Sequence, residues 1–149
     1  MIARPGNIKD ADKIAENNVL LARESEKEVI SYKTTRLGVE SVLNDPEKGF
    51  YIIAEENNEI IGQLMITFEW SDWRNTNIWW LQSVYVNKSH RKKGVFKRLI
   101  EETKQLAIEK DIHILRLYVH IDNKKAIKAY KNIDMKKKPY DIFEYFINE

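Results

Sequence analysis

The sequence has no cysteine among its 149 residues. Disulfide bonds, a thiol nucleophile and thiolate ligation of a metal are therefore excluded, and no metal site is expected. No apolar run approaches the roughly 20 residues of a membrane-spanning helix. The opening residues, MIARPGNIKDADKI, lack the apolar core and small-residue cleavage site of a signal peptide. We therefore expect a cytoplasmic protein without a membrane partner.

An excess of one sign of charge is also missing. The chain has 25 Lys and Arg against 23 Asp and Glu, a formal net charge of +2, which disfavours a general polyanion binder. Its basic residues gather instead at residues 88–98 and 124–138. Such local clusters favour a small anionic ligand over a nucleic-acid groove. A polyanion-binding module, with strongly salt-dependent binding, is the weaker alternative, and no nucleic-acid partner is expected.

Domain boundaries are missing as well, because no repeat, low-complexity linker or Gly/Ser/Pro-rich stretch divides the chain. The composition, 43% apolar and 32% charged, is typical of a globular protein. The length suits one hydrophobic core. We predict a single domain over residues 1–149.

The apolar periodicity predicts an alternation of strands and helices. A first strand at residues 1–4 should end at Pro5 and Gly6, and a helix capped by Asn7 or Asp10 should follow. The later elements are expected as a helix at 35–43, a hairpin of strands 50–55 and 60–70 turning at ENNE, a polar loop at 71–77, a strand at 78–86, a helix from about 94 to 110, a strand at 112–120, a short helix after Asn123 and a last strand at 140–147. This order predicts a mixed α/β sheet with helices packed on it.

The stretch NKSHRKKGVFKRLIEE, residues 87–102, places a basic turn and a glycine at a helix start. A helix N-terminus presents free N–H groups and partial positive charge, and Gly94 allows a phosphate to approach the backbone. Arg91, Lys92 and Lys93 can add charge-assisted hydrogen bonds. The pattern is therefore compatible with a pyrophosphate cradle. A solvated helix face with a turn glycine is the alternative, and neither the P-loop nor the GxGxxG fingerprint is present.

Residues 79–135 resemble the GNAT superfamily of acetyl-CoA-dependent N-acetyltransferases. The family pattern is a strand ending in apolar-x-Val, then Arg-x-x-Gly-x-Gly/Ala and a helix, then a second strand, an Asn, an Ala three residues on and a Tyr four residues later. Here the corresponding residues are Val84–Val86, Arg91–Phe96, Asn123, Ala126 and Tyr130. Two positions depart from the pattern, because Phe96 replaces a small residue and Asp134-Met135 replaces the usual Gly-Phe.

The resemblance implies a fold, a cosubstrate and a set of binding residues. The fold would be of α/β (α+β) class, with a mixed, mostly antiparallel central sheet and helices on both faces. The cosubstrate would be acetyl-CoA, whose pantetheine arm would pair with the main chain of the strand at residues 83–86. The residues implied in its binding are Val84, Tyr85, Val86, Arg91, Lys92, Lys93, Gly94, Val95, Phe96, Lys97, Asn123, Lys125, Ala126 and Tyr130.

The resemblance also implies specific roles for some of these residues. A backbone N–H near Val86 would stabilise the developing oxyanion. Backbone amides of residues 91–96 would hold the pyrophosphate. The 3′-phosphate would meet one of four lysines: Lys92, Lys93, Lys97 or Lys125. Asn123 would bond the pantetheine arm or orient its helix, and a plain N-cap is an equal and compatible interpretation.

Tyr130 is the catalytic candidate, because the matching family tyrosine donates to the departing thiolate. A phenol, with a pKa near 10, is a weaker acid than a thiol, with a pKa near 8.5, by about 1.5 pKa units. Proton transfer from the phenol to the thiolate is therefore uphill by roughly 2 kcal/mol. A hydrogen bond to the nascent thiolate is therefore favoured over full protonation. The alternative is that Tyr130 only packs against Ala126 on an apolar face.

The acceptor would be a small-molecule or peptide amine, attacked directly in a ternary complex. The family's central-strand carboxylate is absent, since Gln82 stands there. The base candidates that remain are Glu69, Asp72, His113, His120 and a water chain. Tryptophans at 70, 73, 79 and 80 could form a wall for a cationic amine, although packing is favoured for Trp79 or Trp80. A homodimer is common in the family, and an acyl-CoA-binding sensor without catalysis is the main alternative function.

Overall fold

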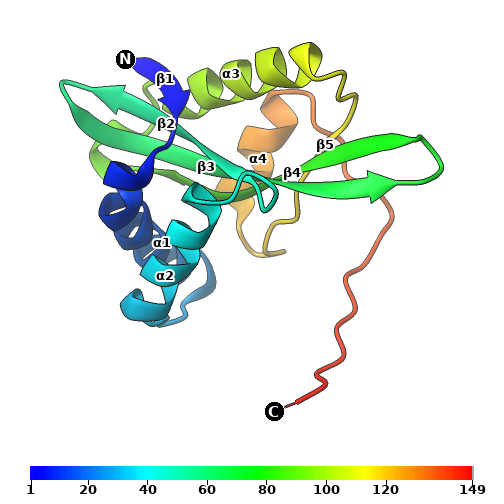
Figure 1. The fold of residues 1–149 in the computed structure, drawn as a ribbon, viewed down its shortest axis with the longest axis horizontal. Helices are drawn as coiled ribbons and strands as arrows, with labels where there is room; N and C mark the ends of the chain where they lie inside the picture. Colours follow the sequence, from blue (N-terminus) through cyan, green and yellow to red (C-terminus); the bar gives the residue numbers. More distant parts are fainter. Residues whose placement is uncertain (149) are drawn as a thin grey trace.

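The computed structural model describes residues 1–148 and is organised around one twisted sheet (Figure 1). Five strands lie in the order β1 (Ile2–Pro5), β2 (Phe50–Glu56), β3 (Glu59–Ser71), β4 (Thr76–Val86) and β5 (Leu115–Arg116). The first three neighbouring pairs are antiparallel, and β4 pairs with β5 in parallel. The prediction of a mixed, mostly antiparallel sheet is confirmed.

Helices cover both faces of this sheet, as predicted (Figure 1). One face carries α1 (Ala11–Glu26) and α2 (Tyr32–Leu43), and the other carries α3 (Val95–Glu109). The period-2 alternation of β2 divides its side chains between them. Ile52 and Ala54 join the cluster under α3, whereas Tyr51 and Ile53 join the cluster under α1 and α2. The fourth helix is α4 (Lys124–Asn132), and two short 3-10 turns lie at Ile8–Asp10 and Lys88–His90.

Both expected capping residues act at the first helical segment, but one turn earlier than predicted. The Asn7 side chain accepts from the Lys9 amide, and Asp10 accepts from the Asn7 amide. This capping box closes the 3-10 turn at Ile8–Asp10, while Asp10 makes no capping bond at the start of α1. The helix at residues 35–43 likewise begins earlier, at Tyr32, because Ser31 accepts from the Thr34 amide.

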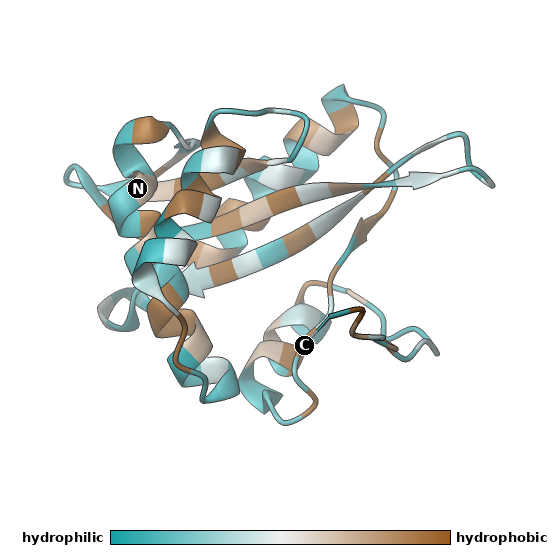
Figure 2. Ribbon diagram, turned by 60° about the horizontal axis from the view of Figure 1, so that its bottom comes forward, coloured by the Kyte–Doolittle hydropathy of each residue, from teal (hydrophilic) through white to brown (hydrophobic). Residues whose placement is uncertain are grey.

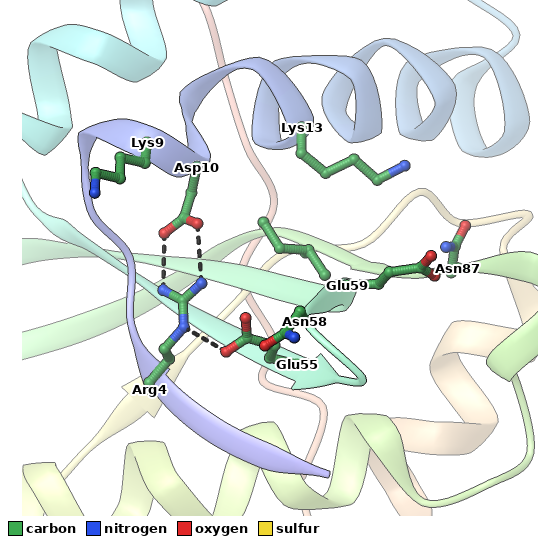
Figure 3. Close-up of a pocket in the computed structure, with 9 residues that line it drawn as sticks. Arg4, Lys9, Asp10, Lys13, Glu55, Asn58, Glu59 and Asn87 are labelled. Atoms are coloured by element: carbon green, nitrogen blue, oxygen red, sulfur yellow. Dashed lines mark hydrogen bonds and ion pairs between the residues drawn. The ribbon is translucent and has the colours of Figure 1, made fainter.

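A hollow beside this turn is lined by residues that form ion pairs with one another (Figure 3). Arg4 donates to both carboxylate oxygens of Asp10, at 2.8 and 2.9 Å, and to Glu55 at 2.9 Å. Burial opposes ionisation of Asp10, but the bonds from Arg4 and Asn7 outweigh it and lower the pKa of the Asp10 carboxyl. Arg4 is thus balanced by two carboxylates, which gives this ion-pair cluster a structural role.

One predicted strand is much shorter than expected, and another is absent from the described residues. Residues 112–120 form a strand only at Leu115–Arg116, and residues 140–147 form none. A strand needs a hydrogen-bonded neighbour, and β4 pairs with β5 only through Trp79 and Trp80. The last residues run away from the sheet in an extended path (Figure 1). The polar loop at 71–77 is also shorter than predicted, since β3 reaches Ser71 and β4 starts at Thr76.

No helix within residues 1–148 has both the length and the apolar character needed to cross a membrane.

Candidate active site

A cleft opens where β4 and the chain after β5 diverge. The two strands pair at Trp79–Leu115 and Trp80–Arg116, and beyond these residues no further pairs join them within the described chain. The resulting cleft has a volume of about 360 Å³. Its walls are Asn18, Leu21, Ala22, Ser25, Glu26, Ile30, Thr35, Leu81, Gln82, Ser83, Val84, Leu117, Tyr118, Val119, His120, Asn123, Ala126 and Tyr130. The cleft therefore joins α1, α2, β4 and α4 with the chain beyond β5.

A β-bulge in β4 shapes one wall of the cleft. Gln63 pairs with Tyr85 and Met65 with Gln82, so two residues of β4 lie opposite one residue of β3. Ser83 takes up the irregularity in the left-handed region, with φ of 50°. A bulge increases local twist and turns backbone groups out of the ladder. It places backbone groups of β4 at the cleft, where the resemblance expects the pantetheine arm.

Buried amide side chains support the bulge from the α1 side. Gln63 is fully buried; it accepts from Asn17 at 2.9 Å and donates to Asn18 at 2.8 Å. Its amide nitrogen also lies 3.5 Å from the Ser83 carbonyl oxygen. Sequence reasoning missed this contact, although a glutamine inside the apolar run IIGQLMI is a signal for it, because buried polar groups need partners.

We expect Gln63→Leu to lower the free energy of unfolding by about 2 kcal/mol, because the Asn17 and Asn18 amides lose a buried partner. Urea unfolding followed by circular dichroism measures the change. Gln82→Leu is the matched control, since Gln82 is only half-buried and bonds to Thr67. Equal losses in the two variants would contradict a special role for the Gln63 network.

The start of α3 has the features of an anion site. Gly94 is the N-cap, with φ of 82° in the left-handed region, and no side chain caps the helix there. The first backbone bond runs from Arg98 N to Gly94 O at 3.0 Å. The amides of residues 95–97 therefore have no intrahelical acceptor. Lys92 is also left-handed, with φ of 63°, so this basic turn can point successive N–H groups at an anion.

In and around the basic turn, Arg91 forms hydrogen bonds within the protein, whereas the lysines are exposed. Arg91 donates to Val86 O at 3.0 Å and to Glu24 at 2.7 Å, which ties the turn to α1. Its guanidinium lies over the Tyr85 ring, 5.4 Å from the centroid. Tyr85 is buried, so its part in cofactor binding would be through the backbone. The four lysines expected near phosphate are exposed and form no ion pair within the described residues: Lys92, Lys93, Lys97 and Lys125.

Tyr130 links the anion site to the cleft. It lines the cleft, and its ring meets the edge of Phe96, with centroids 5.6 Å apart. Phe96 belongs to the first turn of α3 and packs against the core beside Val95. Burial raises the pKa of the Tyr130 phenol. Phe96, which stands where the family pattern has a small residue, thus packs against Tyr130 from the start of α3.

The helix that carries Tyr130 is fixed at both ends. Asn123 is its N-cap and accepts from the Ala126 amide at 3.2 Å, and both residues line the cleft. At the other end, Asp134 adopts the left-handed exit, with φ of 66°, without a glycine. The Met135 amide then donates to Tyr130 O at 3.0 Å. Although Asp134-Met135 replaces the Gly-Phe of the family pattern, the helix therefore still ends with a residue in the left-handed conformation.

Comparison with known proteins decides the family. The profile of the acetyltransferase (GNAT) family matches residues 16–135, which covers the cleft and the basic turn. This chain belongs to the GNAT family.

Relatives of this GNAT chain are acetyltransferases by name. Thialysine N-epsilon-acetyltransferase of Bos taurus is 32% identical over 72 residues, and the Sus scrofa protein is 31% identical over 74. These matches span 48% and 50% of this chain, but only 42% and 43% of the relatives' own length.

Solved structures share the fold of this GNAT chain. A possible acetyltransferase from Clostridium difficile 630 is 36% identical, with a TM-score of 0.91, and the match covers 99% of this chain and 97% of that one. A "predicted acetyltransferase with acetyl-CoA" from Clostridium acetobutylicum is 19% identical, with a TM-score of 0.81 over 96% of this chain and 94% of that one. At that identity the second likeness supports the fold alone.

Most base candidates of this GNAT chain lie outside the cleft. Glu69 accepts from the Trp80 indole at 2.9 Å and pairs with Arg116 at 3.3 Å. Asp72 is exposed in the turn between β3 and β4, and His113 is not among the cleft residues. Of the candidate side chains, only His120 lines the cleft; the amide Gln82 lines it too but cannot take a proton. Gln82 donates to Thr67 at 2.6 Å.

One ionisable residue of the cleft was missed. Glu26, at the end of α1, is the single carboxylate among the lining residues of the described chain. The acidic run ESEKE gave a weak sequence signal for it. It places negative charge at the cleft.

The four tryptophans differ in how far they are buried. Trp79 is 5% exposed and packs edge-on against Phe50, with centroids 5.3 Å apart, so the packing interpretation is confirmed for it. Trp80 is half-buried against Tyr118. Trp70 and Trp73 are exposed toward the end of the β3–β4 hairpin and do not line the cleft. They therefore form no wall for an amine there.

Proposed function

We propose that this protein is an N-acetyltransferase that moves the acetyl group of acetyl-CoA to a primary amine by direct attack in a ternary complex. The observation that carries the proposal is the contact between Phe96 and Tyr130. It joins an anion-binding helix start to a cleft containing a bulged strand and a phenol. A diphosphate and a thioester on one ligand require these two environments side by side.

The residues present fit acetyl-CoA, which would supply a thioester of an activated acyl group. Unpaired amides of residues 95–97, with the exposed lysines around Gly94, suit its phosphates. The exposed backbone of β4 at Ser83 and Val84 suits the amide groups of the pantetheine arm. The same region can donate a backbone N–H to the developing negative charge on the acyl oxygen.

Tyr130 would act on the leaving group. The amine nitrogen forms a bond to the acyl carbon as the carbon–sulfur bond breaks, and negative charge develops on sulfur. Because burial raises the phenol pKa, Tyr130 stays protonated at neutral pH. Proton transfer to a thiolate is uphill by at least roughly 2 kcal/mol, so Tyr130 stabilises the sulfur by donating a hydrogen bond.

The acceptor side of the cleft suits a cationic amine before it is deprotonated. Glu26 would provide the attracting carboxylate, and His120, which lines the same cleft, would take a proton directly or through water once its Nδ1 no longer accepts from the Asp122 amide. An alkyl amine near pKa 10.4 needs about 4–5 kcal/mol for deprotonation at pH 7. The relatives named for the ε-amino group of thialysine support a primary amine on a flexible side chain as acceptor.

A thermal-shift comparison of acetyl-CoA, CoA and ADP tests the binding step. At a ligand concentration 100-fold above Kd, stabilisation of about 2.7 kcal/mol should raise Tm by about 9 °C. Release of CoA across a panel of amines, including thialysine and lysine, then tests turnover. Failure of all three ligands to stabilise the fold would overturn the proposal. Binding without turnover on any amine would favour the acyl-CoA sensor.

A further inference from the structure

Among the described residues, one buried side-chain oxygen has no hydrogen-bond partner. It is the Oδ1 of Asn17, a residue of α1 that is only 1% exposed. An unpaired buried oxygen lowers the stability of a fold, so its presence calls for an explanation. The other end of the same side chain supplies one, because Asn17 Nδ2 donates to Gln63 Oε1 at 2.9 Å.

The bond from Asn17 determines which way the Gln63 amide faces. Gln63 is fully buried on β3, and Figure 2 shows the strands of the sheet banded with hydrophobic residues. With its oxygen directed at Asn17, the Gln63 amide directs its nitrogen at Asn18 Oδ1, 2.8 Å away, and toward the Ser83 carbonyl oxygen at 3.5 Å. A reversed amide would set the Gln63 oxygen against the Ser83 carbonyl oxygen, and neither atom can donate.

At Ser83 this orientation reaches the cleft. Ser83 and Val84 lie opposite a single residue of β3, and Ser83 adopts a left-handed backbone with φ of 50°. This conformation costs free energy for a residue other than glycine, so the contacts around it must hold it. The Gln63 nitrogen approaches the Ser83 carbonyl, while Ser83 and Val84 both line the cleft. A side chain outside the cleft therefore contacts the backbone that is proposed to bind pantetheine.

We infer that Asn17 and Gln63 are positioning residues for the pantetheine arm of acetyl-CoA, an inference that rests on the proposed function. Neither side chain lines the cleft, so both act through the bulge at Ser83. Asn17 fixes the direction of the Gln63 amide, and Gln63 holds the Ser83 carbonyl so that the neighbouring backbone groups face the ligand. The unpaired Asn17 oxygen is then a loss of stability that this orientation requires.

Such a role affects one part of the ligand and not the other. Gln63 forms hydrogen bonds with α1 and approaches β4, whereas the pyrophosphate would bind at the start of α3. Loss of the Asn17–Gln63 pair should therefore weaken the binding of acetyl-CoA but not of ADP, which carries the diphosphate without the pantetheine arm. A purely structural role would weaken both ligands or neither.

Isothermal titration calorimetry with acetyl-CoA and ADP tests this on the full chain. Gln63→Leu should weaken acetyl-CoA binding about tenfold, the factor expected for one lost hydrogen bond, and should change the Kd of ADP less than about threefold. Asn17→Leu should act in the same way with a smaller loss of stability, because it also removes the unpaired oxygen. Val39→Ala is the control, since Val39 is 2% exposed in the core under α1 and α2 and outside the amide network. It should leave both dissociation constants unchanged.

Other results overturn the inference. Equal losses for the two ligands, unchanged affinity for acetyl-CoA, or an equal loss in Val39→Ala would show that the network only stabilises the fold. Should Gln63→Leu fail to fold, Asn17→Leu decides by the same comparison. An unmodified chain that binds acetyl-CoA but not ADP would show that the two parts of the ligand do not bind separately. An unmodified chain that binds neither ligand overturns the proposed function as well, whereas one that binds acetyl-CoA leaves that function standing.

Discussion

Replacing Tyr130 by Phe is expected to lower kcat about 100-fold while leaving the KM for acetyl-CoA within about threefold. The hydroxyl is the group that would donate to the nascent thiolate, and a hydrogen bond to a charged group contributes about 1.5–3 kcal/mol. The interaction develops with charge on sulfur, so its loss should fall on kcat rather than on ground-state binding. Initial rates of CoA release at varied acetyl-CoA measure both constants.

The aromatic packing should survive this substitution. Phe at position 130 can keep the edge contact with Phe96, so the acetyl-CoA thermal shift should be unchanged. Tyr118→Phe is the matched control, because Tyr118 also lines the cleft but its ring packs on Trp80; its kcat should change less than about threefold. Unchanged turnover in Tyr130→Phe would reduce Tyr130 to a packing residue.

The pH dependence provides a separate check of the same role. Tyr130 is active in its neutral form, and burial raises its pKa above the ordinary value of 10. Ionisation of the phenol should therefore cause no loss of kcat as pH rises to about 9. A decline below that pH would belong to another group.

Local sequence signals were sufficient where partners lie near in the chain. The hairpin of β2 and β3, and the start of α3 at Gly94, depend on turn residues and short-range periodicity. The N-cap at Asn123 is similarly local. These elements matched the prediction to within a few residues.

Signals failed where the partner is distant in the chain. Residues 140–147 have strand character, but an apolar alternation does not specify its neighbour. The bulge at Ser83 depends on Gln63 and on two asparagines of α1, which no periodicity connects. Glu26 reaches the cleft only because α1 packs against β4. The local structure of the basic turn and the start of α3 was therefore predictable, whereas the bulge in β4 and the position of Glu26 were not.

Gly62→Val is expected to lower the free energy of unfolding by at least about 3 kcal/mol and to weaken the protection given by acetyl-CoA. A Cβ at Gly62 would lie 2.6 Å from Val95 Cγ1 and 3.4 Å from Leu99 Cδ1. Val95 is 3% exposed and is the first residue of α3. Its β-branched side chain has few rotamers with which to move away, so overpacking must displace the helix start itself.

The displacement connects core packing to the anion site. Because residues 95–97 carry the unpaired amides, a shifted α3 should lose ligand stabilisation beyond the loss of fold stability. Gly38→Ala is the control, since no atom lies within 4 Å of its added Cβ; in the middle of α2 it should raise stability by about 0.5–1 kcal/mol. Urea unfolding with and without acetyl-CoA separates the two effects. A Gly62→Val protein that is destabilised, yet protected by acetyl-CoA as strongly as the Gly38→Ala protein, would show that the phosphates do not bind at the start of α3.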